Sequence, residues 1–254
     1  MLICIDAGHA KSTSGKRSPD SSLREYEFNR DVAKRLKRIL EERGIQTIFS
    51  CDLETDKDVS LIARCRAANE AKADLFISIH ANAYGNGSEW TNANGWEIYY
   101  YKSSTEGAKL AEAIRAESCA TLDLKDRGLK TGDFYVIKNT AMPAVLIEHG
   151  FYTNKEECAK LKTDTFRESC AVADAKGILK YLGIPFEKPV PSNLPYTIRI
   201  TVDALNVRSG PGMNYPKNTI IKDKKLYTII EERSGWGKLK SGAGWISLKY
   251  TSKA

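Results

Sequence analysis

A proline-rich segment late in the chain constrains the fold more than any other feature of the sequence. Residues 183–195 contain four prolines in 13 positions. Proline fixes the backbone φ angle and removes an amide donor, so this segment is typical of a semi-rigid linker. The chain of 254 residues is therefore predicted to have one domain at residues 1–183, a linker at 184–195 and a small domain at 196–254.

Apolar runs and helical periodicities alternate along the first domain. Phe28, Val32 and Leu36 recur at helical spacing, and Gly44 is placed to end that helix. Strands are expected at residues 2–6, 45–49, 75–80, 95–101 and 144–148, and further helices at 108–114 and 166–182. Strands that alternate with helices predict an α/β fold with a mostly parallel sheet flanked by helices.

The small domain has a different pattern, in which short β-rich runs are separated by turn residues. The runs are residues 197–202, 205–208, 219–221, 226–231, 237–239 and 244–246. Glycine, proline and serine between them, as in residues 209–212, are typical of turns. This pattern predicts a small all-β barrel.

The excess positive charge of the chain lies entirely in the small domain. Residues 1–183 carry 27 Lys and Arg against 27 Asp and Glu, the linker carries one of each, and residues 196–254 carry 11 against 4. The difference of seven equals the net charge of +7 of the whole chain. Such a domain is expected to bind nucleic acid, anionic lipid or an anionic wall polymer, although a basic surface can also serve solubility alone.

The six cysteines are scattered and form no C-x-x-C pair, so we expect free, mostly buried thiols. No stretch approaches the roughly 20 apolar residues of a membrane helix. The N-terminus, residues 1–6, has neither the basic lead nor the long apolar run of a secretion signal.

Two of the three histidines directly follow apolar strands. His9 closes the run that begins at Ile3, and His80 closes the run that begins at Leu75. Sites in open α/β sheets collect beyond the carboxyl ends of the strands, so the two histidines can meet there if their strands are neighbours. Histidine nitrogen suits zinc, and a catalytic zinc typically has three protein ligands and one open position. The alternative is that each histidine is simply a polar residue at a strand end.

Carboxylates at two places could complete such a site. Glu25 and Glu27 stand at the expected start of the first helix, and they point in different directions, so only one can be the third ligand. Both could instead only favour the helix N-terminus electrostatically. Glu148 ends a buried strand, where a carboxylate needs a partner. It is either a general base or one side of a structural salt bridge.

Four motifs follow one another along the first domain. They are Asp6-Ala7-Gly8-His9, Glu25-Tyr26-Glu27-Phe28-Asn29, Ser78-Ile79-His80-Ala81-Asn82-Ala83 and Met142-Pro143-Ala144-Val145-Leu146-Ile147-Glu148-His149-Gly150-Phe151. In this order they resemble the motifs of the zinc-dependent N-acetylmuramoyl-L-alanine amidases of the amidase type 3 family. The helix expected over residues 61–69 is similar too, so the match runs across essentially all of the first domain.

The resemblance implies that His9, Glu25 and His80 bind zinc and that Glu148 is catalytic. The family's glutamate ligand belongs to an E-x-x-x-N arrangement, which Glu25 fits and Glu27 does not. The resemblance also implies cleavage of the amide between N-acetylmuramic acid and L-alanine of the stem peptide. In that reaction zinc lowers the pKa of a water, and Glu148 takes its proton and hands it to the leaving amine.

Two stretches depart from the family's pattern. Residues 10–12 are Ala-Lys-Ser where the family more often has glycines, and His149 follows the catalytic glutamate where a small or apolar residue is usual. Neighbours on a strand face opposite sides, so His149 should face away from the zinc if Glu148 faces it.

The small domain carries a second resemblance. Its motifs are Leu205-Asn206-Val207-Arg208-Ser209-Gly210-Pro211-Gly212, Tyr215-Pro216, Gly235-Trp236-Gly237-Lys238-Leu239 and Gly244-Trp245-Ile246. Over residues 197–251 they resemble bacterial Src-homology-3-like domains, which are commonly attached to wall hydrolases. This implies a wall-binding role, with the aromatic residues serving as core or as groove walls.

The sequence therefore predicts a peptidoglycan hydrolase of the endolysin or autolysin kind. Its expected partners are peptidoglycan and anionic cell-wall polymers, with no nucleic acid and no membrane insertion. We expect synthesis in the cytoplasm and action on the wall of a Gram-positive host after release by another component. Two other functions stay open: a wall-binding protein with an inactive catalytic domain, and a zinc peptidase that cuts within the stem peptide.

Overall fold

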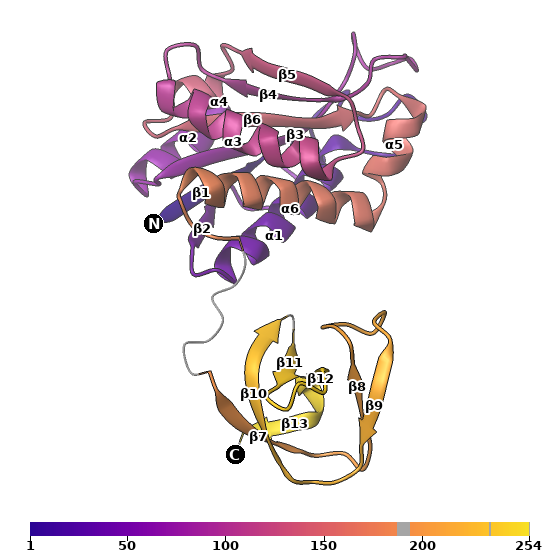
Figure 1. Ribbon diagram of the computed structural model, residues 1–254. Helices are drawn as coiled ribbons and strands as arrows, with labels where there is room; N and C mark the ends of the chain where they lie inside the picture. The colour runs from indigo at the N-terminus through magenta and orange to yellow at the C-terminus, as the bar shows by residue number, and fades with distance from the viewer. Residues whose placement is uncertain (187–193, 234, 254) are drawn as a thin grey trace. The chain divides into compact units, whose positions relative to one another are not determined.

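The computed structural model describes residues 1–186, 194–233 and 235–253. The chain forms two compact units, Met1–Phe186 and Glu187–Ala254, and each is described by itself (Figure 1). Most of the predicted linker, residues 187–193, lies outside the described residues. Its first part belongs to the first unit, because Ile184 and Phe186 pack against the core of that unit.

The first unit is a six-stranded sheet covered by helices. Its elements in chain order are β1 (Leu2–Ala7), α1 (Glu25–Glu41), β2 (Gln46–Phe49), α2 (Leu61–Glu70), β3 (Leu75–Asn82), β4 (Trp96–Tyr100), α3 (Thr105–Thr121), β5 (Asp126–Thr131), α4 (Tyr135–Lys138), β6 (Ala144–Phe151), α5 (Lys155–Leu161) and α6 (Asp164–Tyr181). The strand order is β2-β1-β3-β6-β4-β5. The predicted α/β fold is therefore confirmed for this unit.

The sheet is mixed rather than uniformly parallel. β1 pairs in parallel with β2 and β3, and β3 pairs in parallel with β6. β4 runs antiparallel to β6 and parallel to β5, so one end of the sheet is reversed. The parallel part places the carboxyl ends of β1, β3 and β6 side by side.

Two apolar clusters cover the two faces of this sheet, and the alternation along each strand divides residues between them. Ile3 and Ile5 of β1 join a large cluster with residues of α1, α3 and α6. Cys4, between them, joins a smaller cluster with residues of α2 and α4. Continuous apolar strands of this kind are typical of a sheet buried on both faces.

The second unit is an antiparallel sheet of seven strands. The elements are β7 (Tyr196–Ile200), β8 (Leu205–Arg208), β9 (Lys217–Ile221), β10 (Leu226–Arg233), β11 (Trp236–Leu239), β12 (Trp245–Ser247), a 3₁₀ turn (Leu248–Tyr250) and β13 (Thr251–Lys253). The order is β13-β7-β10-β11-β12-β8-β9. Within the described residues β13 and β9 stand at the two ends of this order, so a closed barrel stays a prediction.

All six cysteines are free thiols, and four of them are buried. In the part of the chain that the structure describes, no helix combines the length and the apolar character needed to cross a membrane.

Candidate metal centre

The carboxyl ends of β1 and β3 bring His9 and His80 together. The two strands are hydrogen-bonded neighbours, and Ala7 of β1 pairs with Ile79 of β3. The two imidazole rings lie edge to face with centroids 5.1 Å apart. His9 has a φ of 62°, a left-handed conformation that is uncommon for a residue with a side chain and is often found at functional sites.

Gly8 allows this approach because it has no side chain. A Cβ atom at position 8 would lie 2.0 Å from Cε1 of His80, whose ring is itself held by a 2.9 Å contact between Nδ1 and Oε1 of Glu25. The carbonyl of Gly8 accepts a 2.8 Å hydrogen bond from Nδ2 of Asn29, one turn into α1. The backbone before His9 is therefore fixed from both β3 and α1.

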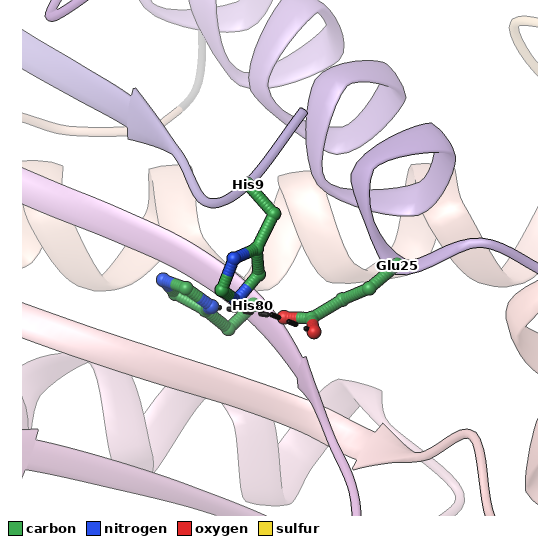
Figure 2. Close-up of side chains that lie close together, drawn as sticks. All are labelled: His9, Glu25 and His80. Carbon is green, nitrogen blue, oxygen red and sulfur yellow. Dashed lines mark hydrogen bonds and ion pairs between the residues drawn. The ribbon is translucent and has the colours of Figure 1, made fainter. Parts of the chain in front are cut away.

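Glu25, the first residue of α1, points its carboxylate at both histidines (Figure 2). Oε1 lies 2.9 Å from Nδ1 of His80, and Oε2 lies 3.4 Å from Nε2 of His9. Asn29 Nδ2 lies 3.4 Å from Oε1, which places the first and second turns of α1 on the same site. One ligand atom from each of His9, Glu25 and His80 lies within 4.8 Å of the others.

The donor set fits a divalent metal ion. Glu25 is 1% exposed, and its Oε2 has no hydrogen-bond partner among the described residues. Burial lowers the pKa of His9 to about 4, which favours the neutral, ligating imidazole. Burial opposes ionisation of Glu25, but the hydrogen bond from His80 and the neighbouring imidazoles lower its pKa overall. Two imidazoles and one carboxylate are the ligands of many catalytic zinc sites.

Glu148 lies beside this donor set on β6. It is the register partner of His80, and both line a cavity of about 510 Å³ that His9 also reaches. Its Oε2 is enclosed and has no hydrogen-bond partner among the described residues. Burial raises the pKa of Glu148 to about 8, against the lowering effect of His80. Strongly perturbed carboxyl groups in a cavity are typical of functional sites.

His149 faces the opposite side of β6, as the alternation of the strand predicts. Its ring is fully buried, and Nε2 lies 3.0 Å from Oδ2 of Asp174 on α6. Nδ1 lies 3.3 Å from the carbonyl oxygen of His80. His149 is thus in the core and is outside the cluster formed by the other two histidines.

Glu27, the other candidate for the third ligand, takes a different role. Its Oε2 accepts a 3.3 Å hydrogen bond from the backbone amide of Arg24 at the start of α1. It therefore favours the helix N-terminus, which is the alternative that the sequence left open.

A buried ion pair beneath His9 was not identified from the sequence. Arg64 of α2 is 2% exposed, and its Nη1 donates to Oδ1 of Asp6 at 2.8 Å and to the carbonyl of Ala7 at 2.7 Å. Ser50 and Ser78 donate their hydroxyls to the same carboxylate. Asp6 belongs to the first of the motifs described above and Arg64 to the helix expected over residues 61–69, but their separation in the sequence hides the contact.

A second polar group missed by the sequence analysis lies on the next strand. Glu97 of β4 is the register partner of Glu148. It is 3% exposed and accepts hydrogen bonds from Arg127 at 2.6 Å and from Lys130 at 2.5 Å. Burial alone would raise the pKa of Glu97, but the hydrogen bonds from Lys130, Arg127 and Tyr99 outweigh it and lower the pKa to about 2. The pKa values of Glu97 and Glu148 are thus shifted in opposite directions.

The mouth of the 510 Å³ cavity is partly apolar. Leu61, Phe134 and Tyr135 line it and are 52%, 41% and 40% exposed. Lys16 lines it as well, with Nζ 4.0 Å from Oε2 of Glu25. A cavity with apolar walls and a few convergent polar groups is typical of a substrate site.

A mixed sheet between helices, with a His-Glu-His donor set at the carboxyl ends of its parallel strands, defines the class as an α/β protein with a candidate metal centre. Residues 3–180 match the model of a family described as N-acetylmuramoyl-L-alanine amidase, and the chain belongs to this family. The resemblance of the first domain to N-acetylmuramoyl-L-alanine amidases is confirmed. The match ends before the second unit.

Relatives of known name support this assignment. The N-acetylmuramoyl-L-alanine amidase LytC of Bacillus subtilis is 39% identical over 181 residues, which are 70% of this chain and 35% of LytC. The endolysin of Bacillus phage SPP1 is 37% identical over 190 residues, which are 72% of this chain and 66% of the endolysin. The match thus spans about a third of one relative and about two thirds of the other.

A solved structure shows the same fold. The catalytic domain of CwlV, an N-acetylmuramoyl-L-alanine amidase from Bacillus (Paenibacillus) polymyxa var. colistinus, superposes with a TM-score of 0.66 at 32% identity. The similarity covers 72% of this chain and 99% of that domain.

Proposed function

We propose that this protein is a zinc-dependent amidase that cleaves peptidoglycan between N-acetylmuramic acid and the L-alanine of the stem peptide. The observation that carries the proposal is the convergence of His9, Glu25 and His80 within 4.8 Å, beside Glu148, in a member of this amidase family. Family members named as a bacterial amidase and as a phage endolysin support action on the cell wall, in the manner of an autolysin or an endolysin.

The three donors would hold the ion through Nε2 of His9, the carboxylate of Glu25 and the imidazole of His80. When bound, zinc supplies Lewis-acid chemistry, since it polarises a carbonyl oxygen and lowers the pKa of a water. Asn29 orients the donor set through its hydrogen bonds to Gly8 and Glu25. Such partners of metal ligands are commonly as important as the ligands themselves.

Glu148 is the proposed general base. Its enclosed carboxylate faces the same cavity as His9 and His80, so it can accept the proton of the attacking water and pass it to the leaving amine. A nearby cation would lower the raised pKa of Glu148 and favour the proton-accepting form. Leu61, Phe134 and Tyr135 at the mouth are placed to contact the substrate.

For the second unit we propose a Src-homology-3-like domain that binds the cell wall. Two features support this: the antiparallel sheet of short strands, and the excess of 11 basic over 4 acidic residues in residues 196–254. The proposed domains are residues 1–183 and 196–254, and they are joined by the predicted linker at 184–195, of which Ile184 and Phe186 pack against the first domain. A positively charged unit is suited to capture an anionic wall polymer.

Two alternatives give different outcomes in one experiment, in which purified peptidoglycan is digested and the products are analysed by mass spectrometry. The proposed amidase releases stem peptides with a free L-alanine amine and leaves glycan strands without peptides. A zinc peptidase would leave part of each stem peptide on the glycan. An inactive wall-binding protein would release nothing, and either result would disprove the proposal.

Three variants distinguish the role of the metal ligands from the role of the general base. His80→Ala should lose both zinc and activity, because it removes one of three ligands. Glu148→Gln should keep zinc and lose activity by about 10² or more, the usual scale for a general base. His149→Gln is the matched control: it changes the next residue on β6, faces Asp174 and should keep zinc and most activity. Elemental analysis measures zinc, and turbidity loss of cell walls measures activity.

The assignment has clear failure points. Active protein without zinc would disprove the metal scheme. Zinc loss in His149→Gln but not in a Glu25→Gln variant would replace Glu25 by His149 as the third ligand. Wild-type activity in Glu148→Gln would leave Glu148 a structural residue.

A further inference from the structure

The second unit contains a cavity of about 260 Å³ that has no role in the proposed chemistry. It is lined by residues just before β8, by residues of β8 that include Arg208, by Met213 in the loop that follows, by Trp236 of β11 and by residues near the 3₁₀ turn that include Tyr250. Tyr250 is 41% exposed, so the cavity opens to solvent along an aromatic wall. It is smaller than the roughly 300–1,000 Å³ of typical ligand pockets, which suits one end of a molecule rather than a whole chain.

Arg208 is the unusual residue of this cavity, because it is a buried cation without a counter-ion. Arg208 is only 7% exposed. Nη1 donates a 2.7 Å hydrogen bond to the carbonyl of Tyr215, and Nη2 reaches only the thioether of Met213, a weak acceptor, at 3.8 Å. Nε is buried and has no hydrogen-bond partner. Among the described residues, no carboxylate lies within ion-pair distance of Arg208.

The unused donors lie on one edge of the guanidinium. Nε and Nη2 together form a fork that matches the two oxygens of a carboxylate, while Nη1 is already committed to Tyr215. A buried charge that lacks a partner is unfavourable, and so is a buried donor without an acceptor. An anionic ligand that enters the cavity would supply the missing counter-charge and a stronger acceptor for Nη2 than the thioether of Met213.

We propose that this cavity binds the C-terminal carboxylate of a peptide, with Arg208 as its anchor. This proposal rests on the proposed function, and it identifies the occupant as the free D-alanine end of an uncrosslinked stem peptide. The apolar lining fits this end group, because Val202 and Ala204 offer contact to a methyl group and Trp236 offers a flat wall to the peptide. Asn206 and Ser247 supply polar groups for the terminal amide.

A phosphate of an anionic wall polymer fits the cavity less well. A phosphodiester is flanked by polymer on both sides and is better met by a strip of exposed lysines. The cavity instead offers one buried guanidinium and several apolar side chains, which suits a single negative charge at the end of a chain. The exposed lysines of the unit, such as Lys222 and Lys225, can still speed the first encounter with the wall.

The test is a calorimetric titration of the full chain with N-acetyl-L-lysyl-D-alanyl-D-alanine and, separately, with its C-terminal amide. The free acid should bind at least about tenfold more tightly than the amide, because only the acid fills the fork of Arg208. Inorganic phosphate should compete only weakly. Equal binding of acid and amide, no binding of either at millimolar concentration, or equally strong competition by phosphate would each overturn the proposal.

Two variants in the same unit sharpen the comparison. Arg208→Lys keeps the charge but loses the fork, so the acid should bind about tenfold more weakly. Arg199→Lys is the matched control, since Arg199 also donates to one backbone carbonyl, that of Lys224, but is exposed and away from the lining. If Arg208→Lys does not fold, as judged by its thermal unfolding, Tyr250→Ala replaces it and should weaken binding of the acid severalfold. Unchanged binding in the folded variant would overturn the proposal.

Sedimentation with purified walls separates this inference from the proposed function. If the full chain sediments with walls but does not bind the peptide acid, the cavity is not the wall site while wall binding stands. If sedimentation depends on teichoic acid and the peptide acid does not compete, a phosphate polymer is the ligand and the proposal is wrong. If the chain does not sediment at all, the wall-binding role of the second unit fails as well.

Discussion

Asp6 supports the candidate metal centre without being part of it. Its carboxylate accepts hydrogen bonds from Ser50, Ser78 and Arg64, and Arg64 in turn donates to the carbonyls of Ala7 and Val59. These contacts tie β1, β3 and α2 together three residues before His9. A buried ion pair with every partner satisfied fixes geometry, and breaking one side of it is strongly destabilising.

Asp6→Asn should therefore destabilise the protein by about 3 kcal/mol at pH 7, because it removes the buried one of the two carboxylates that pair with Arg64 and leaves only the partly exposed Asp58. Burial opposes ionisation of Asp6, but Arg64 and the two serines lower its pKa overall. The unfolded chain then takes up a proton before the folded protein does, so wild-type stability falls as pH falls below about 4. The difference between the two proteins should narrow over the same range, as measured by urea unfolding at pH 7, 5 and 3.5.

Glu54→Gln is the control for this experiment. Glu54 pairs with Lys34 at 2.7 Å, but its side chain is 77% exposed, and exposed pairs contribute about 0–1 kcal/mol. A stability difference between Asp6→Asn and wild type that stayed constant from pH 7 to pH 3.5 would show that ionisation of Asp6 contributes nothing.

That the two histidines lie together could be predicted from the sequence, and their role as metal ligands stays a prediction, whereas the residues that position them could not be predicted. His9 and His80 were identified because each directly follows an apolar strand, and strand ends collect functional groups. The choice between Glu25 and Glu27 needed either the family pattern or the helix geometry, since both lie in the first turn of α1. Arg64 contacts a carboxylate 58 residues away, and no local pattern reports such a contact.

At the scale of elements, strands with apolar runs were predicted and a polar strand was missed. β1, β2, β3, β4 and β6 overlap the expected segments. β5, Asp126–Thr131, is the outer strand beyond β4 and has no fully buried residue, so its sequence lacks the apolar run that predicts a strand. The reversed direction of β4 depends on how the chain crosses the sheet, which a pattern of apolar residues does not encode.

The packing of α3 against α6 depends on one glycine. Gly177 lies within α6, and a Cβ atom there would lie 2.3 Å from the Cα of Ile114 on α3. Both helices belong to the apolar cluster on the same face of the sheet. The close approach of the two backbones is therefore possible only with glycine at this position.

Gly177→Ala should destabilise the first unit by about 1–3 kcal/mol, the range for overpacking a well-filled core. The sign of the change in stability is informative, because replacing glycine by alanine inside an exposed helix stabilises a protein by about 1 kcal/mol. Ser169→Ala, also on α6, is the control and should change stability by less than about 0.5 kcal/mol. Thermal and urea unfolding measure both, and a stabilised Gly177→Ala protein would contradict the proposed close packing.

At the scale of the whole molecule, the candidate site and the excess positive charge lie in different units. The first unit, Met1–Phe186, holds the whole candidate metal centre, Glu148 and the 510 Å³ cavity. The second unit, Glu187–Ala254, carries the excess positive charge, since residues 1–183 hold 27 basic and 27 acidic residues. If this division is functional, the two units should keep separate activities when they are produced as separate fragments.

The Met1–Phe186 fragment should cleave soluble muropeptides yet bind walls weakly, because its site is complete and its net charge is zero. The Glu187–Ala254 fragment should sediment with purified walls. Attraction between exposed charges is screened with a Debye length of about 8 Å at physiological salt, so binding by charge alone should vanish as salt rises. Recognition in a buried cavity should persist, and we expect a mixture in which charge sets the rate of capture and the cavity sets specificity.

A pull-down of both fragments on walls across a salt series from about 0.05 to 1 M measures this division. The Debye length falls from about 10 Å at 0.1 M to about 3 Å at 1 M, so the charge-dependent part of binding is lost within the series. A fraction of the Glu187–Ala254 fragment that stays bound at 1 M salt reports specific recognition. If that fragment fails to bind at any salt while Met1–Phe186 binds well, the second unit does not target the wall, and its positive charge serves solubility alone.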